Sequence, residues 1–268
     1  MDKLFSKIEH SRTADEVVAQ IEALILEGVL RVNDRLPGER ELARQFDISR
    51  PILRDALKML EARGLLVTRH GGGTHVADVI GEIFAAPVLD IIVAHPKAVA
   101  DYFEYRREIE GTASEYAARR ATRDDKALLD RILERMEKAH LAADPDAETA
   151  IDVEFHNAVG ECAHNIILLH TLRSCYRLLS SGVFKARGMI YHLPGVRDAI
   201  LEQHRAIHAA IAKGDPAEAR SVAEAHIDFV WNAMAEAERA DEWQRVARLR
   251  LTQRLQHNEN KRTRTNAV

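Results

Sequence analysis

The chain has 268 residues and a formal net charge of −4, and 46% of its residues are hydrophobic while only 5% are aromatic. A chain of this length has enough material for two domains, each with its own hydrophobic core. The composition is that of a helix-rich globular protein and excludes the collagen-like, disordered and disulfide-scaffold classes. Because the net charge is negative, any surface for nucleic acid must be a local basic patch.

Targeting and membrane segments are not expected from this sequence. The first residues form no apolar signal segment, and two cysteines, Cys162 and Cys175, are too few for a disulfide framework. The longest apolar stretch, residues 85–94, is interrupted by Pro87 and Asp90 and is far shorter than the roughly 20 residues that cross a bilayer. We therefore expect a protein of the reducing cytoplasm with no membrane contact.

Residues 1–78 have the pattern of a winged helix-turn-helix DNA-binding domain. Apolar residues recur at helical spacing in three segments, and two short β-like runs around a glycine-rich turn follow them. Ser49 stands where it can cap the third helix, and Pro51 suits the first turn of that helix. The expected elements are helices at residues 13–27, 39–46 and 50–63 and a hairpin at 65–76.

The basic residues of this domain gather where a DNA-reading helix would begin. Between residues 35 and 76 there are eight basic and five acidic residues, so the segment carries +3 in a chain of net charge −4. Arg50 and Arg54 are one turn apart at the start of the third helix, where a planar guanidinium can donate two hydrogen bonds to guanine. Arg40, early in the preceding helix, can reach a phosphate or a base edge.

Four motifs, at residues 36–43, 48–57, 60–66 and 71–76, resemble the GntR-type winged-helix regulators. In that family, the arginines that match Arg40, Arg50 and Arg54 contact DNA, and so do the wing residues that match His70 and Gly71. One position departs from the family pattern, because Gly38 stands where a small hydroxyl residue or alanine is usual. The resemblance implies a homodimer that binds a pseudo-palindromic operator in double-stranded DNA.

Residues 79–242 predict an all-helical domain, and residues 243–268 form a basic tail. The segment 79–242 is rich in Ala, Leu and Glu, and turn-forming residues divide it into six or seven amphipathic pieces of helix length. We therefore expect a mainly α protein, in which the winged helix-turn-helix domain is followed by an antiparallel bundle of six or seven helices. In the tail we expect the last helix to end near Leu255.

Histidine and aspartate residues of this helical domain are candidate metal ligands. Asp152 and His156 are four residues apart in a predicted helix at 147–162 and so share a face, while His204 and His226 lie in two other helices. Three imidazoles and a carboxylate suit Zn²⁺, Ni²⁺ or Mn²⁺. By composition and spacing alone, four further histidines qualify equally well: His164, His170, His192 and His208.

The region from residue 83 to residue 240 is similar to the FCD ligand-binding domain of the FadR branch of GntR regulators. That resemblance selects the metal ligands Asp152, His156, His204 and His226, with zinc as the first choice. It also implies that Arg106, one turn before Glu110, donates to the carboxylate of a small effector of the pyruvate, lactate or glycolate type. The alternative for Arg106 is an ordinary arginine on a helix surface.

The leading hypothesis is a ligand-controlled transcription factor, and two alternatives stand beside it. One is a metal-dependent enzyme with a DNA-binding head, and the other is a regulator that senses the metal itself. An enzyme needs a general base beside the metal, and the nearest candidate, Glu154, points about 200° away from Asp152 around the helix. The sequence also has no His-Glu-x-x-His motif and no nucleophile elbow. We therefore expect no catalytic residues.

Overall fold

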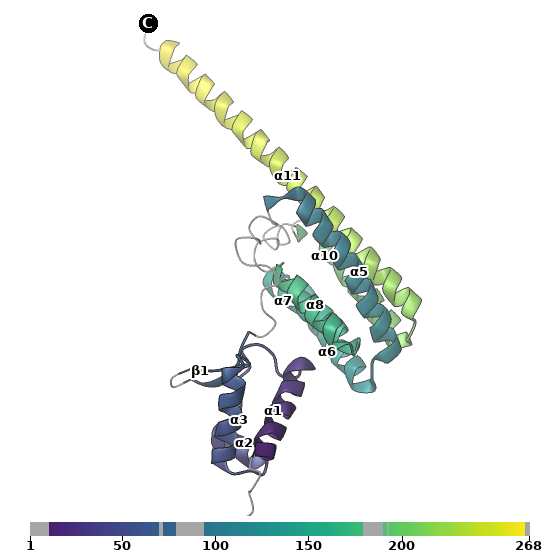
Figure 1. Ribbon diagram of the computed structural model, residues 1–268. Helices are drawn as coiled ribbons and strands as arrows, with labels where there is room; N and C mark the ends of the chain where they lie inside the picture. The colour runs from purple at the N-terminus through teal and green to yellow at the C-terminus, as the bar shows by residue number, and fades with distance from the viewer. Residues whose placement is uncertain (1–10, 70–71, 79–93, 179–189, 192, 266–268) are drawn as a thin grey trace, which may run out of the picture. The chain divides into compact units, whose positions relative to one another are not determined.

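A computed structural model describes residues 11–69, 72–78, 94–178, 190–191 and 193–265 of the chain (Figure 1). The chain divides into two compact units, an N-terminal unit from Met1 to Ile83 and a helical unit from Phe84 to Val268. Each unit has its own cluster of buried hydrophobic residues. Nine described helices and one two-stranded sheet confirm the mainly α class.

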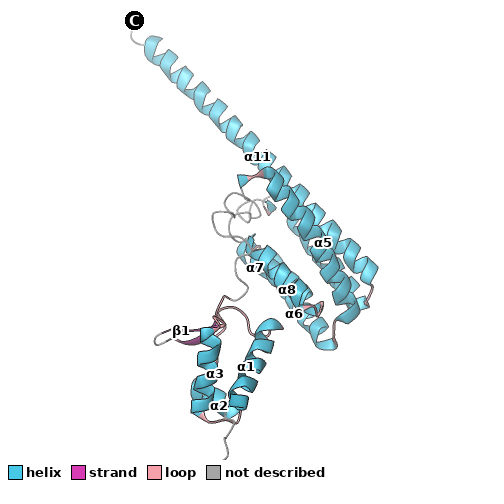
Figure 2. Ribbon diagram, viewed as in Figure 1, coloured by secondary structure: helices cyan, strands magenta, loops and turns pink. Residues whose placement is uncertain are grey.

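The N-terminal unit is a winged helix-turn-helix, as predicted (Figure 2). Its two strands pair antiparallel, with Leu66 opposite Val76 and Arg69 opposite Gly73, and form the expected hairpin. Its elements are α1 (Ser11–Leu26), α2 (Glu39–Gln45), α3 (Arg50–Ala62), β1 (Leu66–Arg69) and β2 (Gly73–Val76).

The inner face of α3 carries the core of this unit. Leu53 and Leu60 are fully buried and pack with Val17 and Ile21 of α1. The opposite face is left to charged residues, as an amphipathic helix requires. One local prediction was wrong, because the Ser49 side chain makes no cap hydrogen bond among the described residues, although its backbone is extended as at an N-cap.

The helical unit contains six described helices, within the predicted range of six or seven. The long helix α5 packs along the first part of α11 and also contacts α7, α8 and α10 (Figure 1). The six are α5 (Pro96–Arg120), α6 (Arg123–Leu141), α7 (Pro145–Cys162), α8 (Ile166–Leu178), α10 (Val196–Lys213) and α11 (Pro216–Thr265).

Local signals fix the ends of the helices that matter for the site. Asp144 caps α7, since its side chain accepts a hydrogen bond from the backbone N–H of Ala147. Gly195 and Gly214 flank α10 with φ of 76° and 74°, a left-handed conformation that glycine adopts without steric cost. These signals determine where α7 and α10 begin and end, and so which stretches of the chain carry the residues that face the site.

The end of the last helix differs from the prediction. α11 runs without a break for 50 residues to Thr265, well beyond the end expected near Leu255, so the basic tail starts inside this helix. Neither glycine nor proline occurs between Pro216 and Thr265 to stop it. Among the described residues, no helix combines the length and the apolar character that a membrane span requires.

Candidate metal centre and nucleic-acid interface

Three helices of the helical unit bring four metal-ligand side chains together. Asp152 and His156 come from α7, His204 from α10 and His226 from α11, and all four are buried. One ligand atom from each residue lies within 4.8 Å of those of the other three. The four residues selected in the sequence therefore form one cluster.

Each histidine of the cluster is oriented by a hydrogen bond at its Nδ1 atom. Nδ1 of His156 lies 2.8 Å from Oε2 of Glu110, Nδ1 of His204 lies 2.8 Å from the carbonyl oxygen of Ile200, and Nδ1 of His226 lies 2.8 Å from Oε1 of Gln203. Because these partners accept hydrogen bonds, the proton of each neutral ring belongs on Nδ1. The lone pair of each Nε2 atom is then directed into the cluster, as metal ligation requires.

The four ligand atoms that meet in the cluster are all hydrogen-bond acceptors. Nε2 of His204 lies 3.3 Å from Nε2 of His156 and 3.3 Å from Oδ1 of Asp152. Nε2 of His226 is buried and has no hydrogen-bond partner among the described residues. A cation relieves such an arrangement, and tetrahedral bonds of 2.0–2.1 Å would place ligand atoms about 3.4 Å apart. The residues therefore fit a divalent metal ion.

Burial favours the neutral, ligating form of His204 and His226. It lowers the pKa of His204, and it lowers the pKa of His226 well below the usual value. At neutral pH these rings carry no proton that a metal ion would first have to displace.

The other candidate histidines that the structure describes lie outside the cluster. His208 is one turn from His204 but pairs with Asp130, at 2.7 Å, and His164 pairs with Asp125, at 2.8 Å. His170 is half-buried outside the cluster, and His192 lies outside the described residues. Spacing within one helix could not separate these histidines, because the packing of α7, α10 and α11 decides which rings meet.

Arg106 is buried beside the cluster and is not a surface residue. Its side chain is 1% exposed, its Nε donates to Oε1 of Glu110 at 2.9 Å, and its Nη2 donates to the Tyr176 hydroxyl at 2.6 Å. Burial alone would raise the pKa of Glu110, but the adjacent His156 and Arg106 outweigh it and hold the pKa far below its usual value. The resemblance to the FCD domain singled out Arg106 and Glu110 but not the pair that they form, and no sequence signal indicated Tyr176.

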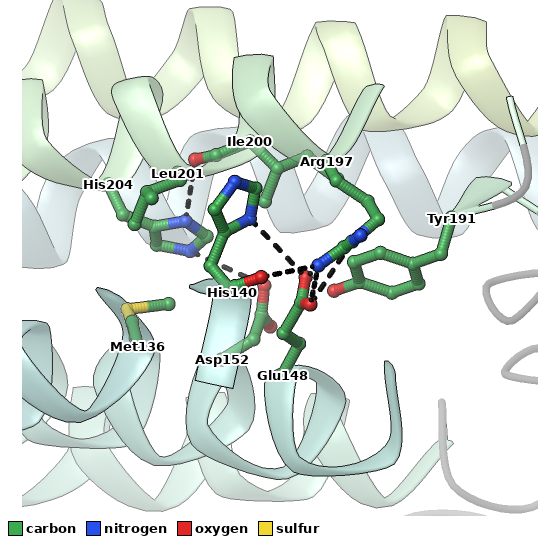
Figure 3. Close-up of a pocket in the computed structure, with 9 residues that line it drawn as sticks. All are labelled: Met136, His140, Glu148, Asp152, Tyr191, Arg197, Ile200, Leu201 and His204. Atoms are coloured by element: carbon green, nitrogen blue, oxygen red, sulfur yellow. Dashed lines mark hydrogen bonds and ion pairs between the residues drawn. The ribbon is translucent and has the colours of Figure 1, made fainter. Parts of the chain in front are cut away.

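A small cavity opens beside the cluster (Figure 3). Its volume is about 20 Å³, and Asp152 and His204 line it together with residues that the sequence analysis did not single out. Two of these are charged: Glu148 lies one turn before Asp152 on α7, and Arg197 lies two turns before His204 on α10. The complete lining is Met136, His140, Glu148, Asp152, Tyr191, Arg197, Ile200, Leu201 and His204.

The acid considered as a general base lies away from this site. Glu154 pairs with Arg135 of α6 at 2.7 Å, and its side chain is partly exposed. It does not belong to the cluster of ligand atoms or to the cavity lining. Glu154 thus lies outside the site, in agreement with its position on the helix relative to Asp152.

In the N-terminal unit, the arginines chosen as DNA contacts lie at the surface. The side chains of Arg50 and Arg54 are 56% and 54% exposed, and both lie against Glu39 of α2, at 3.5 Å and 2.8 Å. Arg40 is also exposed. The wing residues His70 and Gly71 lie outside the described residues.

Comparisons with known proteins agree on both units. Residues 13–76 match the model of the bacterial regulatory proteins of the gntR family, and residues 101–229 match the FCD domain. The "Putative L-lactate dehydrogenase operon regulatory protein" of Escherichia coli K12 is 38% identical over 94% of this chain and 96% of its own length. The chain belongs to the GntR family of transcriptional regulators.

Two further proteins are similar to this GntR regulator. The "Glc operon transcriptional activator" of Escherichia coli K12 is 31% identical over 83% of this chain and 89% of its own length. The structure of a GntR protein from Streptococcus agalactiae is 29% identical, covers 82% of this chain and 98% of its own, and has a TM-score of 0.48.

The family decides between the classes of function considered above. This GntR regulator is a ligand-responsive DNA-binding protein, because its two matched regions are a DNA-binding domain and an effector-binding FCD domain. Its relatives are transcriptional regulators and not enzymes, so the enzyme alternative is not favoured. FCD domains in general bind metal ions, and the matched region contains the whole Asp/His cluster as well as Arg106.

Proposed function

We propose that this regulator responds to a small carboxylate of the lactate, glycolate or pyruvate class that binds at a divalent metal ion in the helical unit. The observation that carries the proposal is the convergence of three buried Nε2 lone pairs and one carboxylate. A metal ion there would supply a Lewis-acid centre for an oxygen of the effector. Zinc is the first choice, with nickel and manganese as alternatives, and the ligands are Asp152, His156, His204 and His226.

The class of effector follows from chemistry and from one relative. A metal ion beside a buried guanidinium suits a small acid, and Arg106 is the arginine in that position. Its partner Glu110 also contacts His156, so Arg106 and the metal ligands belong to one hydrogen-bonded network. The name of one relative refers to an L-lactate dehydrogenase operon, which supports a 2-hydroxy acid.

For DNA, we propose that Arg50 and Arg54 contact bases in the major groove and that Arg40 contacts a phosphate or a base edge. His70 and Gly71 would contact the minor groove at the tip of the wing. A cytoplasmic homodimer would present two such heads to a pseudo-palindromic operator, with half-sites about one helical turn apart. The effector changes operator binding only if it binds two conformations of the regulator with different affinity.

Metal analysis and calorimetry test the sensor. Purified protein should contain about one divalent ion per chain, and His204→Ala/His226→Ala protein should contain none. L-lactate, glycolate or pyruvate should bind the metal-loaded protein, while propionate, which has no oxygen at carbon 2, serves as the control. Metal-free native protein that gains no thermal stability from Zn²⁺, Ni²⁺ or Mn²⁺ would overturn the proposal. A change of operator binding on adding metal alone would favour a metal sensor instead.

Binding to an operator selected from random DNA tests the DNA interface. Arg50→Ala and Arg54→Ala should each reduce discrimination between the operator and random duplex by about 1–3 kcal/mol. Arg119→Ala is the matched control, because it removes one exposed arginine from the helical unit. Unchanged discrimination in both test variants would refute these contacts.

A further inference from the structure

The inward faces of α7 and α10 continue beyond the metal ligands to a pair of opposite charges. On α7, Glu148 lies one turn before Asp152, and on α10, Arg197 lies two turns before His204. Nε of Arg197 lies 3.1 Å and 3.2 Å from the two carboxylate oxygens of Glu148. The same helical faces therefore present the metal ligands and this ion pair.

The cavity runs from the ion pair to the metal ligands. At one end Arg197 is 26% exposed, whereas at the other end Asp152 is 1% exposed and His204 is not exposed at all. Figure 3 shows the guanidinium of Arg197 in contact with the carboxylate of Glu148 in the lining of the pocket, with Tyr191 beside them. Arg197 and Glu148 thus lie at the solvent end of a path that leads to two ligands of the cluster.

In this conformation the cavity is too small for an effector. Its volume of about 20 Å³ accommodates little more than one water molecule. A three-carbon 2-hydroxy acid has six non-hydrogen atoms and needs more room. With 26% of its side chain exposed, Arg197 is the most exposed charged group of the lining, so it can move without disturbing the buried core.

We propose that Arg197 binds the carboxylate of the effector at the solvent end of this cavity. Until the effector binds, the guanidinium of Arg197 is paired with Glu148. This inference rests on the proposed function and adds a second arginine to it: the buried Arg106 does not line this cavity, so Arg197 would meet the carboxylate first, as the effector enters. Glu148 carries the same chemical group as the effector, and the planar guanidinium holds a carboxylate through two parallel hydrogen bonds. The exchange replaces one carboxylate by another, so Arg197 stays paired, while the effector adds one negative charge to the site.

A second partner is available for the displaced glutamate. Nδ1 of His140 lies 3.8 Å from Oε2 of Glu148 and has no hydrogen-bond partner among the described residues. Nε2 of His140 lies 2.9 Å from Oδ1 of Asp198, an exposed carboxylate that water can solvate. His140 would therefore give up this contact, carry its proton on Nδ1 and donate to Glu148 once Arg197 has turned to the effector. Glu148 is largely buried, so a waiting donor reduces the cost of releasing it.

A purely structural role for Arg197 predicts different results. Nη2 of Arg197 also donates to the carbonyl oxygen of His140 near the end of α6, at 2.8 Å, which stabilises that helix end. If this is all that Arg197 does, Arg197→Ala protein melts at a lower temperature but binds carboxylates as the wild type does. Affinity and melting temperature must therefore be measured on the same preparation.

Calorimetry with L-lactate, glycolate and pyruvate on full-length, zinc-loaded protein tests the recognition. Arg197→Ala should weaken the binding of the acid that the wild type binds by about ten-fold or more, and Arg197→Lys should restore only part of it. Glu148→Gln should bind the acid more tightly, because the resident competitor has lost its charge. Arg205→Ala is the matched control, since Arg205 is on the same helix but pairs with Glu137 and Glu202 at the surface.

A second measurement does not depend on the identity of the effector. If the ion pair closes the path to the metal, then Arg197→Ala and Glu148→Gln should lose zinc to dipicolinate faster than the wild type does. Affinity and zinc release that both remain at wild-type values in Arg197→Ala overturn the inference, whatever its melting temperature. Should no acid of the panel bind the wild type, the proposed function fails, and zinc release alone then supports or overturns the role of the pair.

Discussion

Oε2 of Glu110 lies 2.8 Å from Nδ1 of His156, although the two residues are 46 positions apart in the sequence. The contact fixes the proton of the ring on Nδ1 and directs Nε2 to the cluster. The other oxygen of Glu110 accepts from Nε of Arg106 at 2.9 Å. One buried carboxylate therefore orients a metal ligand and, at the same time, the arginine proposed to bind the effector.

Replacing Glu110 by glutamine should weaken metal binding by about 10- to 100-fold, as is typical when a residue that orients a ligand is changed. The glutamine amide has one acceptor and one donor, so it cannot accept from both His156 and Arg106. Competition with a chelator of known affinity measures the effect. Glu108→Gln, a change in an exposed ion pair between α5 and α11, is the control. An unchanged metal affinity would show that Glu110 does not orient the ligand.

The sequence predicted the contacts that lie within one helix. The four-residue spacing placed Asp152 and His156 on one face, because the helical repeat alone decides such pairs. It could not rank His204 above His208, since that choice depends on how α10 packs against α7 and α11. Only the resemblance to the FCD domain selected His204 over His208.

Features that depend on distant packing were missed for the same reason. The pair of Arg197 and Glu148 needs the relative position of α7 and α10, which no local pattern contains. The end of α11 was placed too early, although a helix with no glycine or proline after Pro216 has no strong signal to stop. The winged helix-turn-helix was predicted well because its turns, hairpin and periodicity are local signals.

Glu39 should tune the selectivity of the DNA-binding helix. Its carboxylate accepts a hydrogen bond from Arg54 at 2.8 Å, and this contact holds the pKa of Glu39 below its usual value, so the group is charged at neutral pH. Glu39→Gln should raise the affinity for random duplex a few-fold, because a negative charge near the phosphates is removed. Selectivity for the operator should fall, because the guanidinium is held less firmly.

Titration of operator and random duplex at one salt concentration measures both effects of Glu39→Gln. Glu41→Gln is the control on the same helix, since Glu41 pairs with Arg44 at the surface. A ratio of operator to random affinity that stays at the wild-type value would refute the role of Glu39.

The two cysteines should be unreactive in the folded protein. Burial raises the pKa of Cys162 to about 12 and that of Cys175 to about 11. At pH 8 a thiol reagent such as DTNB should label neither cysteine in native protein and both in urea. Because the folded pKa values are raised, these thiols should cost stability as the pH rises above about 9, where the unfolded chain ionises first. Rapid labelling of native protein at pH 8 would contradict the burial.

Leu53→Ala should destabilise the N-terminal unit by about 2–5 kcal/mol and leave the metal centre intact. Leu53 is fully buried in the core of that unit, whereas the metal ligands lie in the other unit, which has a separate core. The only two tryptophans of the chain, Trp231 and Trp243, are both on α11, so their fluorescence reports on the helical unit. In urea, part of the helical signal in circular dichroism should be lost at a lower urea concentration than in the wild type, while the fluorescence transition and the metal content stay unchanged.

Lys58→Ala, at an exposed position of the same helix, is the control and should change stability by no more than about 0.5 kcal/mol. A fluorescence transition that shifts together with the circular dichroism would show that the two units unfold as one.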